Sequence, residues 1–434
     1  MRTYSSYLLG PLAALSVLTL SSCGSSTNQA QIRVLNVSMG YKSLDLYVND
    51  GTTNTDTSEL QAVPYETTSD YKSMNSGTYS IKFKVNGLTD TLATLSGEKL
   101  ADQTHTTYIA FGSSGNFGDL KISEDVGDPT TGNSLVTVYN TAEAGALDVY
   151  LTDPSASLTD ASPTFSTVSS GSTSSATTVQ QGTYRLRVTA AGNKADLRID
   201  VPSITFNDQQ VSSLILTSTL GGVLVNAMYL PQQGTLTKYE NTQARVRAAV
   251  GIADGTAVTA SIGGLALLNN ATVGIIGSSY GQITAGSAAV TLSVDGNPVT
   301  VANQTLTAGG DYTLLVWSDA NGTQTSLITD DNHVPSISTD VKLRLLNGMS
   351  ALGAPVTLTA NFSPVAEGIA VGQASSPDEV PSGTTDYELD VSNATNGASL
   401  LSKTSVTLQA GNVYTLFVAG GGTATVIGSL HEDR

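Results

Sequence analysis

The chain has 434 residues and a formal net charge of −17, with 19 Lys and Arg against 36 Asp and Glu. So acidic a surface repels nucleic acid, which excludes a nucleic-acid-binding function. Apolar residues make up 40% of the sequence, with 42 Gly and 13 Pro. This composition excludes collagen-like and wholly disordered chains and favours strands joined by turns.

Residues 1–22 are predicted to be a lipoprotein signal peptide. Arg2 precedes an apolar run from Tyr7 to Leu20, which ends in Leu20-Ser21-Ser22-Cys23. This ending resembles the lipobox of bacterial lipoproteins, in which the leader is cut before the cysteine and the cysteine is acylated. The alternative is a simple secretory signal with an incidental cysteine. Because Cys23 is the only cysteine, no disulfide can form within the chain.

The lipobox resemblance implies an exported protein that is anchored to the bacterial cell envelope by lipid on Cys23. Gly24 follows the cysteine. In Gram-negative lipoproteins an Asp at that position usually causes retention at the inner membrane, so Gly24 favours the outer membrane. Residues 23–30 are expected to form the lipidated cysteine and a short polar tether.

A pair of strand-like stretches recurs along the chain at intervals of roughly 100 residues. The first stretch reads Arg33-Val34-Leu35-Asn36, Thr137-Val138-Tyr139-Asn140, Arg247-Ala248-Ala249-Val250 and Arg344-Leu345-Leu346-Asn347. The second reads Leu44-Asp45-Leu46-Tyr47-Val48, Leu147-Asp148-Val149-Tyr150-Leu151, Ala257-Val258-Thr259-Ala260 and Val356-Thr357-Leu358-Thr359. Each period is about the length of one small β-domain.

The recurrence predicts four modules separated by polar linkers. The modules span residues 31–126, 134–230, 243–332 and 340–430, and the third is degenerate. The linkers at 127–133, 231–241 and 333–339 are expected to let the modules extend in line, to well over about 100 Å from the anchor. A Ser/Thr/Gly-rich stretch from Ser166 to Thr178 is expected to be a long flexible loop.

Within the modules, alternation of apolar and polar residues indicates strands. From Tyr79 to Val85 the apolar side chains fall on one face, and Asn86-Gly87 follows as a turn. Short strands at turn-punctuated intervals are typical of a β-sandwich. The predicted fold class is therefore all-β, with four tandem Ig-like antiparallel β-sandwich modules after the signal peptide.

The recurring stretches resemble a bacterial family, the domain of unknown function numbered DUF4397. The resemblance lies in the opening strand that ends in Asn, the Leu-Asp-Val-Tyr strand, Gly77-Thr78-Tyr79 with Gly182-Thr183-Tyr184, and the late strand Tyr414 to Val418. Modules one and two match best and module four fairly, whereas module three lacks the Asn and the Leu-Asp-Val-Tyr strand. The resemblance implies exported, lipid-anchored sandwiches and no agreed reaction, cofactor or site residue.

The sequence offers little for catalysis. Gly277-Ser278-Ser279-Tyr280-Gly281 fits the nucleophile elbow of hydrolases, but Gln282 to Ala289 lacks the helical character that the elbow needs. Ser69-Asp70-Tyr71-Lys72 fits the S-x-x-K motif of a second class of serine enzymes, but the S-D-N and K-T-G motifs that accompany it are missing. The three histidines, at 105, 333 and 431, show no spacing of a zinc site. Catalysis by Ser279 is thus a minor hypothesis, and no cofactor is predicted.

A few residues are candidates for ligand contact. Asp330-Asp331-Asn332 could offer oxygens to Ca²⁺ but lacks the glycine and distal Glu of an EF-hand loop. Trp317 could stack on a sugar ring, although its place in an apolar strand favours packing at the sheet or a domain seam. Tyr47 and Tyr150 alternate with buried-type residues, which places them on the outer strand face.

These observations favour a non-enzymatic, lipid-anchored envelope protein whose modules act as a surface spacer or a binding array. The alternative is an array of carbohydrate- or envelope-binding modules, and a serine hydrolase is the third hypothesis. The expected partners are the membrane, through the lipid anchor, and an envelope protein or a glycan. The charges are expected on turns and outer strand faces.

Overall fold

The structure is a computed structural model that describes residues 28–53, 55–252, 255–383, 386–420 and 425–434. The predicted signal peptide, Cys23 and most of the predicted tether lie outside the described residues. Strands and turns account for the described chain, which contains no helix. No helix long and apolar enough to cross a membrane is therefore found in these ranges.

Module one consists of two sheets around an apolar core. One sheet has the order β4-β1-β8-β9, with β5 also paired to β1, and the other has the order β3-β2-β6-β7. Its strands are β1 (Gln29–Val37), β2 (Ser43–Asn49), β3 (Thr57–Pro64), β4 (Thr67–Thr68), β5 (Lys72–Asn75), β6 (Gly77–Val85), β7 (Thr91–Leu100), β8 (His105–Ser113) and β9 (Asn116–Ser123). The core unites Ile32 and Val34 of the first sheet with Leu46 and Phe83 of the second.

The other three modules repeat this plan. Module two comprises β10 (Asn133–Asn140), β11 (Leu147–Thr152), β12 (Phe165–Val168), β13 (Ser172–Thr173), β14 (Thr177–Gln180), β15 (Gly182–Ala190), β16 (Asn193–Phe206), β17 (Val211–Ser218), β18 (Val225–Pro231) and β19 (Thr237–Tyr239). Module three comprises β20 (Gln243–Val250), β21 (Val258–Ile262), β22 (Leu265–Ala271), β23 (Gly281–Thr284), β24 (Gly286–Ala288), β25 (Val290–Val294), β26 (Asn297–Val299), β27 (Gln304–Leu306), β28 (Asp311–Asp319) and β29 (Gly322–Asp330). Module four comprises β30 (Asp340–Gly348), β31 (Val356–Ala360), β32 (Ser363–Ile369), β33 (Gln373–Ala374), β34 (Asp378–Pro381), β35 (Tyr387–Asn393), β36 (Ser399–Val406), β37 (Val413–Ala419) and β38 (Ile427–Glu432).

The predicted all-β class with tandem sandwiches is confirmed, with one refinement. In each module the opening strand pairs in parallel with the late central strand: β1 with β8, β10 with β17, β20 with β28, and β30 with β37. All other strand pairs described are antiparallel. We call the sheet with the parallel pair the seam sheet and the opposite one the outer sheet.

The Asn that ends the opening strand is a buried connector between strands. The Asn36 side chain donates to the Val63 carbonyl at 3.0 Å and accepts from the Ser38 amide at 3.1 Å. Asn140 and Asn347 make equivalent contacts. All three are 0% exposed. Because a buried backbone group without a partner is costly, this Asn satisfies two such groups at once.

The polar residue of the Leu-Asp-Val-Tyr strand stabilises a β-bulge in the outer sheet. The Asp45 carboxylate accepts a hydrogen bond from the Ala62 amide, and the Asp148 carboxylate accepts one from the Thr167 amide, each at 2.7 Å. Ala62 and Thr167 both have φ of +52°, and the register of the neighbouring strands shifts there. Thr259 accepts the amide of Asn270 in the same way in module three. The motif therefore supports a local backbone shape.

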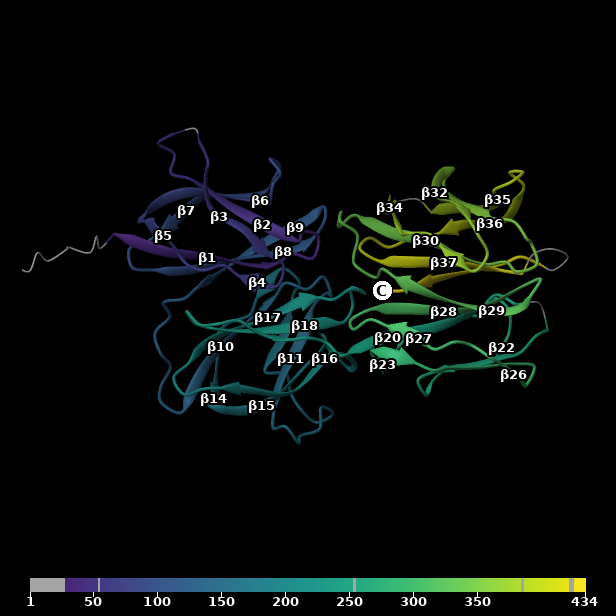
Figure 1. Ribbon diagram of the computed structural model, residues 1–434, viewed down its shortest axis with the longest axis horizontal. Coiled ribbons are helices and arrows are strands. Elements are labelled where there is room, and N and C mark those ends of the chain that lie inside the picture. The colour runs from purple at the N-terminus through teal and green to yellow at the C-terminus, as the bar shows by residue number, and fades with distance from the viewer. Residues whose placement is uncertain (1–27, 54, 253–254, 384–385, 421–424) are drawn as a thin grey trace, which may run out of the picture.

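The modules do not extend in line; they pack as two pairs side by side (Figure 1). Modules one and two share an apolar cluster that includes Leu35, Ile109, Ile215 and Met228. Modules three and four share another, of Leu315, Leu346, Phe417 and their neighbours. The expectation of an extended chain was wrong, because the outer faces of the seam sheets are apolar and cover one another.

The structure also corrects the expectations of a long loop in module two and of an unstructured linker after it. The stretch Ser166 to Thr178 is no long loop, since β12, β13 and part of β14 lie within it and pair with β11 and β10. The linker at 231–241 contains β19, which adds to the edge of the seam sheet of module two. Asn241 at its end is 5% exposed and donates to two backbone carbonyls.

Candidate functional site

Three of the four seam sheets carry the same set of polar side chains: an Arg, a Thr beside it, and an acidic residue at or just past the end of the neighbouring strand. In module one the Arg33 Nε donates to the Thr107 hydroxyl at 2.8 Å and the guanidinium pairs with Glu124 at 2.8 Å. The corresponding sets are Arg247, Thr313 and Asp330 in module three and Arg344, Thr415 and Asp433 in module four. The Arg and Thr positions pair in register across the parallel strands.

At the seam between modules three and four, the two sets exchange partners. Arg344 of module four pairs with Asp330 of module three at 2.8 Å. Arg247 of module three pairs with Asp433 of module four at 2.5 Å. The four side chains are at most 2% exposed. Such buried charges are tolerated only when each is paired and hydrogen-bonded, so the two modules must keep one fixed relative position.

Tyr280 lies at the centre of this exchange. The Arg245 and Arg247 guanidinium carbons each lie 4.6 Å from the centroid of its ring. Its hydroxyl donates to Asp330 at 2.7 Å. Burial and the Asp330 carboxylate raise the pKa of Tyr280 well above its ordinary value. The phenol therefore stays neutral and donates a hydrogen bond; it is not poised as a base.

The Asp330 carboxylate is held in its ionised form. Burial alone would raise its pKa, but Arg344 and Arg247 together with hydrogen bonds from Thr313 and Tyr280 lower it. Asp311, by contrast, is buried with Arg245 as its charged partner at 2.6 Å. There burial outweighs the cation and raises the pKa.

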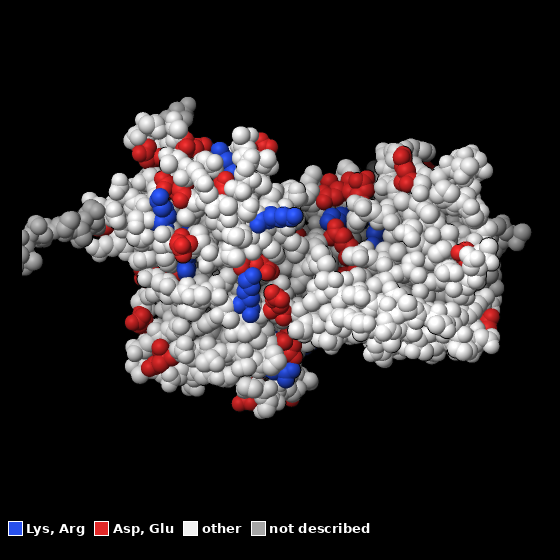
Figure 2. Space-filling model, in the orientation of Figure 1, with Lys and Arg blue, Asp and Glu red and all other residues white. Residues whose placement is uncertain are grey.

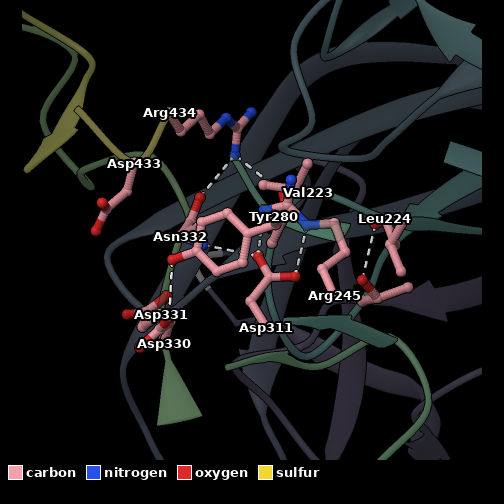
Figure 3. Close-up of polar contacts among 12 residues, drawn as sticks. Val223, Leu224, Arg245, Tyr280, Asp311, Asp330, Asp331, Asn332, Asp433 and Arg434 are labelled. Atoms are coloured by element: carbon pink, nitrogen blue, oxygen red, sulfur yellow. Dashed lines mark hydrogen bonds and ion pairs between the residues drawn. The ribbon is translucent and has the colours of Figure 1, made fainter. Parts of the chain in front are cut away.

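A second polar junction joins the two pairs of modules. Figure 3 shows Arg434 reaching the backbone beside Asn332, while Asp311 lies between Asn332 and Arg245. Arg434 donates to the carbonyls of Gly222 in module two and Asn332 in module three, both at 3.0 Å. Burial and nearby Arg198 lower the pKa of Arg434 to about 10. Three modules are thus joined by one side chain.

The seam between modules one and two is closed differently. Arg33 donates to the Gly234 carbonyl at 2.9 Å, and Glu124 accepts the Gln233 amide at 2.5 Å. The Gln232 side-chain amide pairs with both backbone groups of Val126, each at 3.0 Å. To the Arg33–Glu124 pair module two supplies backbone groups, where module four supplies charges to the pairs of module three.

All four modules contribute to a surface groove of about 680 Å³ at the junction. Its lining includes Met39 of module one, Leu220 of module two, Asp331 of module three and the segment 373–377 of module four. Figure 2 shows charged side chains gathered on module one and along the junction, whereas the visible face of module three is nearly free of them. This groove is the clearest candidate for contact with a partner.

The hydrolase hypothesis finds no matching geometry around Ser279. Ser279 is exposed in a bend between the isolated bridge at Ile276 and strand β23. The elbow needs a strand before it and a helix after it, and the structure has a turn and a strand. Ser69 and Lys72 have separate partners. The Ser69 hydroxyl accepts a hydrogen bond from the Val34 amide, and Lys72 pairs with Glu59.

The candidate ligand-contact residues occupy varied settings. Trp317 lies at the seam of modules three and four, where its ring packs on Gly372 and its Nε1 donates to Ser326 at 2.9 Å. Tyr150 is 1% exposed and offers no free face. Tyr47 is half-buried, with the Lys84 ammonium 4.4 Å from its ring centroid.

The Asp330-Asp331-Asn332 side chains diverge to different partners. Asp330 forms an ion pair with Arg344. Asp331 pairs with His333 and Lys342, and Asn332 donates to Asp311 at 2.7 Å. Among the described residues, no group of three or more His, Cys, Asp or Glu side chains is arranged to hold a metal. These residues thus stabilise the junction.

Sequence reasoning missed the Arg–Thr–acid sets. The expectation that charges lie on turns and outer faces was wrong for Arg33, Arg247 and Arg344, which are at most 4% exposed. A signal was present: Arg opens three of the four recurring stretches, and an acid ends or directly follows the last strand of the same modules.

Comparison with protein families matches the description "Domain of unknown function (DUF4397)" over residues 30–150, 244–354 and 349–434. Module one and the start of module two are matched, but residues 151–243 are not, so the expectation of a good match was wrong for most of module two. Module three, which was expected to match poorly, is included. A comparison with curated proteins finds no match.

Two solved structures share limited likeness with the chain. One is a candidate cell adhesion protein from Bacteroides uniformis, 14% identical, with a TM-score of 0.22, covering 46% of this chain and 99% of its own. The other is a family CBM26 module of Amy13K from Eubacterium rectale in complex with maltoheptaose, 10% identical, with a TM-score of 0.15, covering 48% and 96%. At these values neither structure indicates what this chain binds.

Proposed function

The chain belongs to the DUF4397 family of domains of unknown function, and from that premise we propose that it is a non-enzymatic, lipid-anchored protein of the bacterial cell envelope. Its four modules form one rigid platform that presents a binding surface. The observation that carries this proposal is the exchange of Arg344–Asp330 and Arg247–Asp433 across the seam. Buried ion pairs whose shortest contacts cross between modules favour a fixed assembly over a flexible spacer.

The charged groups at the junction support a structural role. Catalysis needs an activated nucleophile, an acid–base pair or a bound metal. Here Asp311, Asp330 and Asp433 are paired with arginines, and the Tyr280 hydroxyl donates to Asp330 at 2.7 Å. A broad screen of ester, peptide and glycoside substrates should find no turnover. Reproducible turnover that is lost in Ser279→Ala would replace this proposal with the hydrolase hypothesis.

Anchoring through Cys23 is the second part of the proposal. Strand β1 starts at Gln29, so the chain from Cys23 to Gln29 can span only about 20 Å. The start of β1 lies at the module-one end of the long axis, opposite modules three and four (Figure 1). The platform would thus stand on module one. Metabolic labelling with a fatty-acid analogue should label the wild type, and equal labelling of Cys23→Ala would refute the anchor.

The four-module groove is the proposed contact surface for an envelope protein or glycan. Leu220 lines it and is 51% exposed, whereas Leu88 is similarly exposed, at 57%, and is not among the groove residues. Leu220→Arg should weaken binding of the labelled chain to purified host envelopes at least threefold, and the matched control Leu88→Arg should not. Equal binding by both variants and the wild type would exclude the groove.

A further inference from the structure

Module two departs from its neighbours at two adjacent positions of the seam sheet. Continuing the strand registers by one residue aligns Arg33 with Tyr71, Arg247 with Tyr280, Arg344 with Pro377, and Thr137 with Ala176. In modules one and three the Arg stacks on the Tyr ring at 4.5 and 4.6 Å. Module two therefore has small side chains where modules one and three have a stacked Arg–Tyr pair.

This substitution leaves a space at the seam of modules one and two. A cavity of about 250 Å³ is lined by Thr137 and Ala176 of module two and by Ser123 and Glu124 of module one. At the other seam the matching space is crossed by Arg344, which bonds Asp330 and reaches the Thr329 carbonyl. The cavity is thus the unfilled counterpart of a site that a side chain occupies elsewhere in the chain.

The walls of the cavity select for a neutral occupant. Leu135, Val211 and Leu230 line it with apolar side chains, and Thr137, Tyr139 and Ser213 add hydroxyl groups. Burial raises the pKa of Tyr139, so its hydroxyl remains neutral.

The charged groups at the cavity are already paired. Glu124 is held by Arg33 and by the Gln233 amide, and Lys121 pairs with Glu98 at 2.9 Å. An ionised ligand would have to lose its hydration without gaining a free counter-charge.

We propose that this cavity binds a small, neutral, single-ring molecule with one hydroxyl group, in the place of the Tyr side chain of modules one and three. Apolar cavities of roughly 150 Å³ already accept benzene, so a substituted ring fits the volume. The ring would lie against Leu135, Val211 and Leu230, and its hydroxyl would bond Thr137 or Ser213. This site lies within one module pair and is separate from the four-module groove.

The probe is p-cresol, which has the structure of a tyrosine side chain. Isothermal titration into the chain from Gly24 onward should show one saturable site. Ala176→Tyr restores the ring found in modules one and three and should weaken binding at least tenfold. Ala195→Tyr adds the same ring at an exposed position of β16 and should leave binding unchanged. The anion 4-hydroxybenzoate should bind at least tenfold more weakly than p-cresol.

A second variant, with a side chain of nearly unchanged shape, keeps the proposal testable if Ala176→Tyr does not fold. Thr137→Val removes one hydroxyl of the lining and should weaken p-cresol binding three- to tenfold. The absence of saturable p-cresol binding to the wild type would overturn the proposal. So would equal binding to Ala176→Tyr, or to Thr137→Val if Ala176→Tyr does not fold.

Discussion

Arg344 of module four and Asp330 of module three form an ion pair of 2.8 Å with side chains that are 2% and 0% exposed. The two residues are only 14 positions apart in sequence, yet they belong to different sandwiches. Desolvation of such a pair costs several kcal/mol per ion, which good geometry and added hydrogen bonds must offset. The seam is therefore more sensitive to the loss of one partner than to the loss of both.

Replacing Arg344 with Met should lower the free energy of unfolding by about 3–5 kcal/mol, because Asp330 loses its main buried cation. Denaturant titration of the chain from Gly24 onward measures this change. The matched control is Arg185→Met, since Arg185 pairs with Asp200 at 2.5 Å but with side chains 34% and 28% exposed. That control should cost about 1 kcal/mol or less. Equal losses in the two variants would contradict the importance of burial.

Asp148→Ala should destabilise module two through its β-bulge. The Asp148 carboxylate accepts the amides of Thr167 at 2.7 Å and Gly192 at 2.8 Å. Removing it leaves two partly buried N–H groups without a partner, at a cost of about 2–4 kcal/mol. Asp148→Asn retains one acceptor oxygen and should lose less, as thermal unfolding can show. If Ala and Asn were equally harmful, charge would outweigh hydrogen bonding.

His431 predicts a fall in stability on mild acidification. Burial, reinforced by the Arg247 cation, lowers its pKa below the ordinary 6.5. The folded protein therefore takes up this proton less readily than the unfolded chain, so stability is complete above about pH 6.5 and is lost as the pH falls through the folded pKa. His431→Gln should flatten the unfolding free energy in that range. Parallel pH profiles for wild type and variant would refute this assignment.

Solution scattering should report a compact particle. A compact chain of about 400 residues has a radius of gyration of about 22 Å, and the paired arrangement should come close to this value. An in-line array of four modules would give a much larger radius. Arg434→Ala, which removes the contacts to Gly222 and Asn332, should increase the radius by separating the two pairs. A wild-type particle already extended would contradict the packing.

The sandwich modules could be predicted from the sequence. The alternation from Tyr79 to Val85, for example, places Ile81 and Phe83 in the core, as the structure confirms. The sequence was not sufficient for the pairing of modules. The sequence pattern predicts a solvent-exposed side chain for Arg247, because a polar residue on a strand usually faces water. Its partner Asp433 lies 186 positions away in the sequence. Nor does alternation separate a wet outer face from one that another sheet covers. The repeated Arg was visible in the recurring stretches, but its meaning depends on which module lies opposite.

The distance in sequence between Arg247 and Asp433 bears on how the chain matures. During synthesis Arg247 emerges 186 residues before the carboxylate that neutralises it. Until then the seam face of module three, with Ala249, Ile276 and Leu315, has no cover and its cation has no partner across the seam. A nascent chain in this state exposes an apolar surface to other copies of the chain. The two modules of the pair therefore mature as one unit, and chaperones would be needed longest while module four is still incomplete.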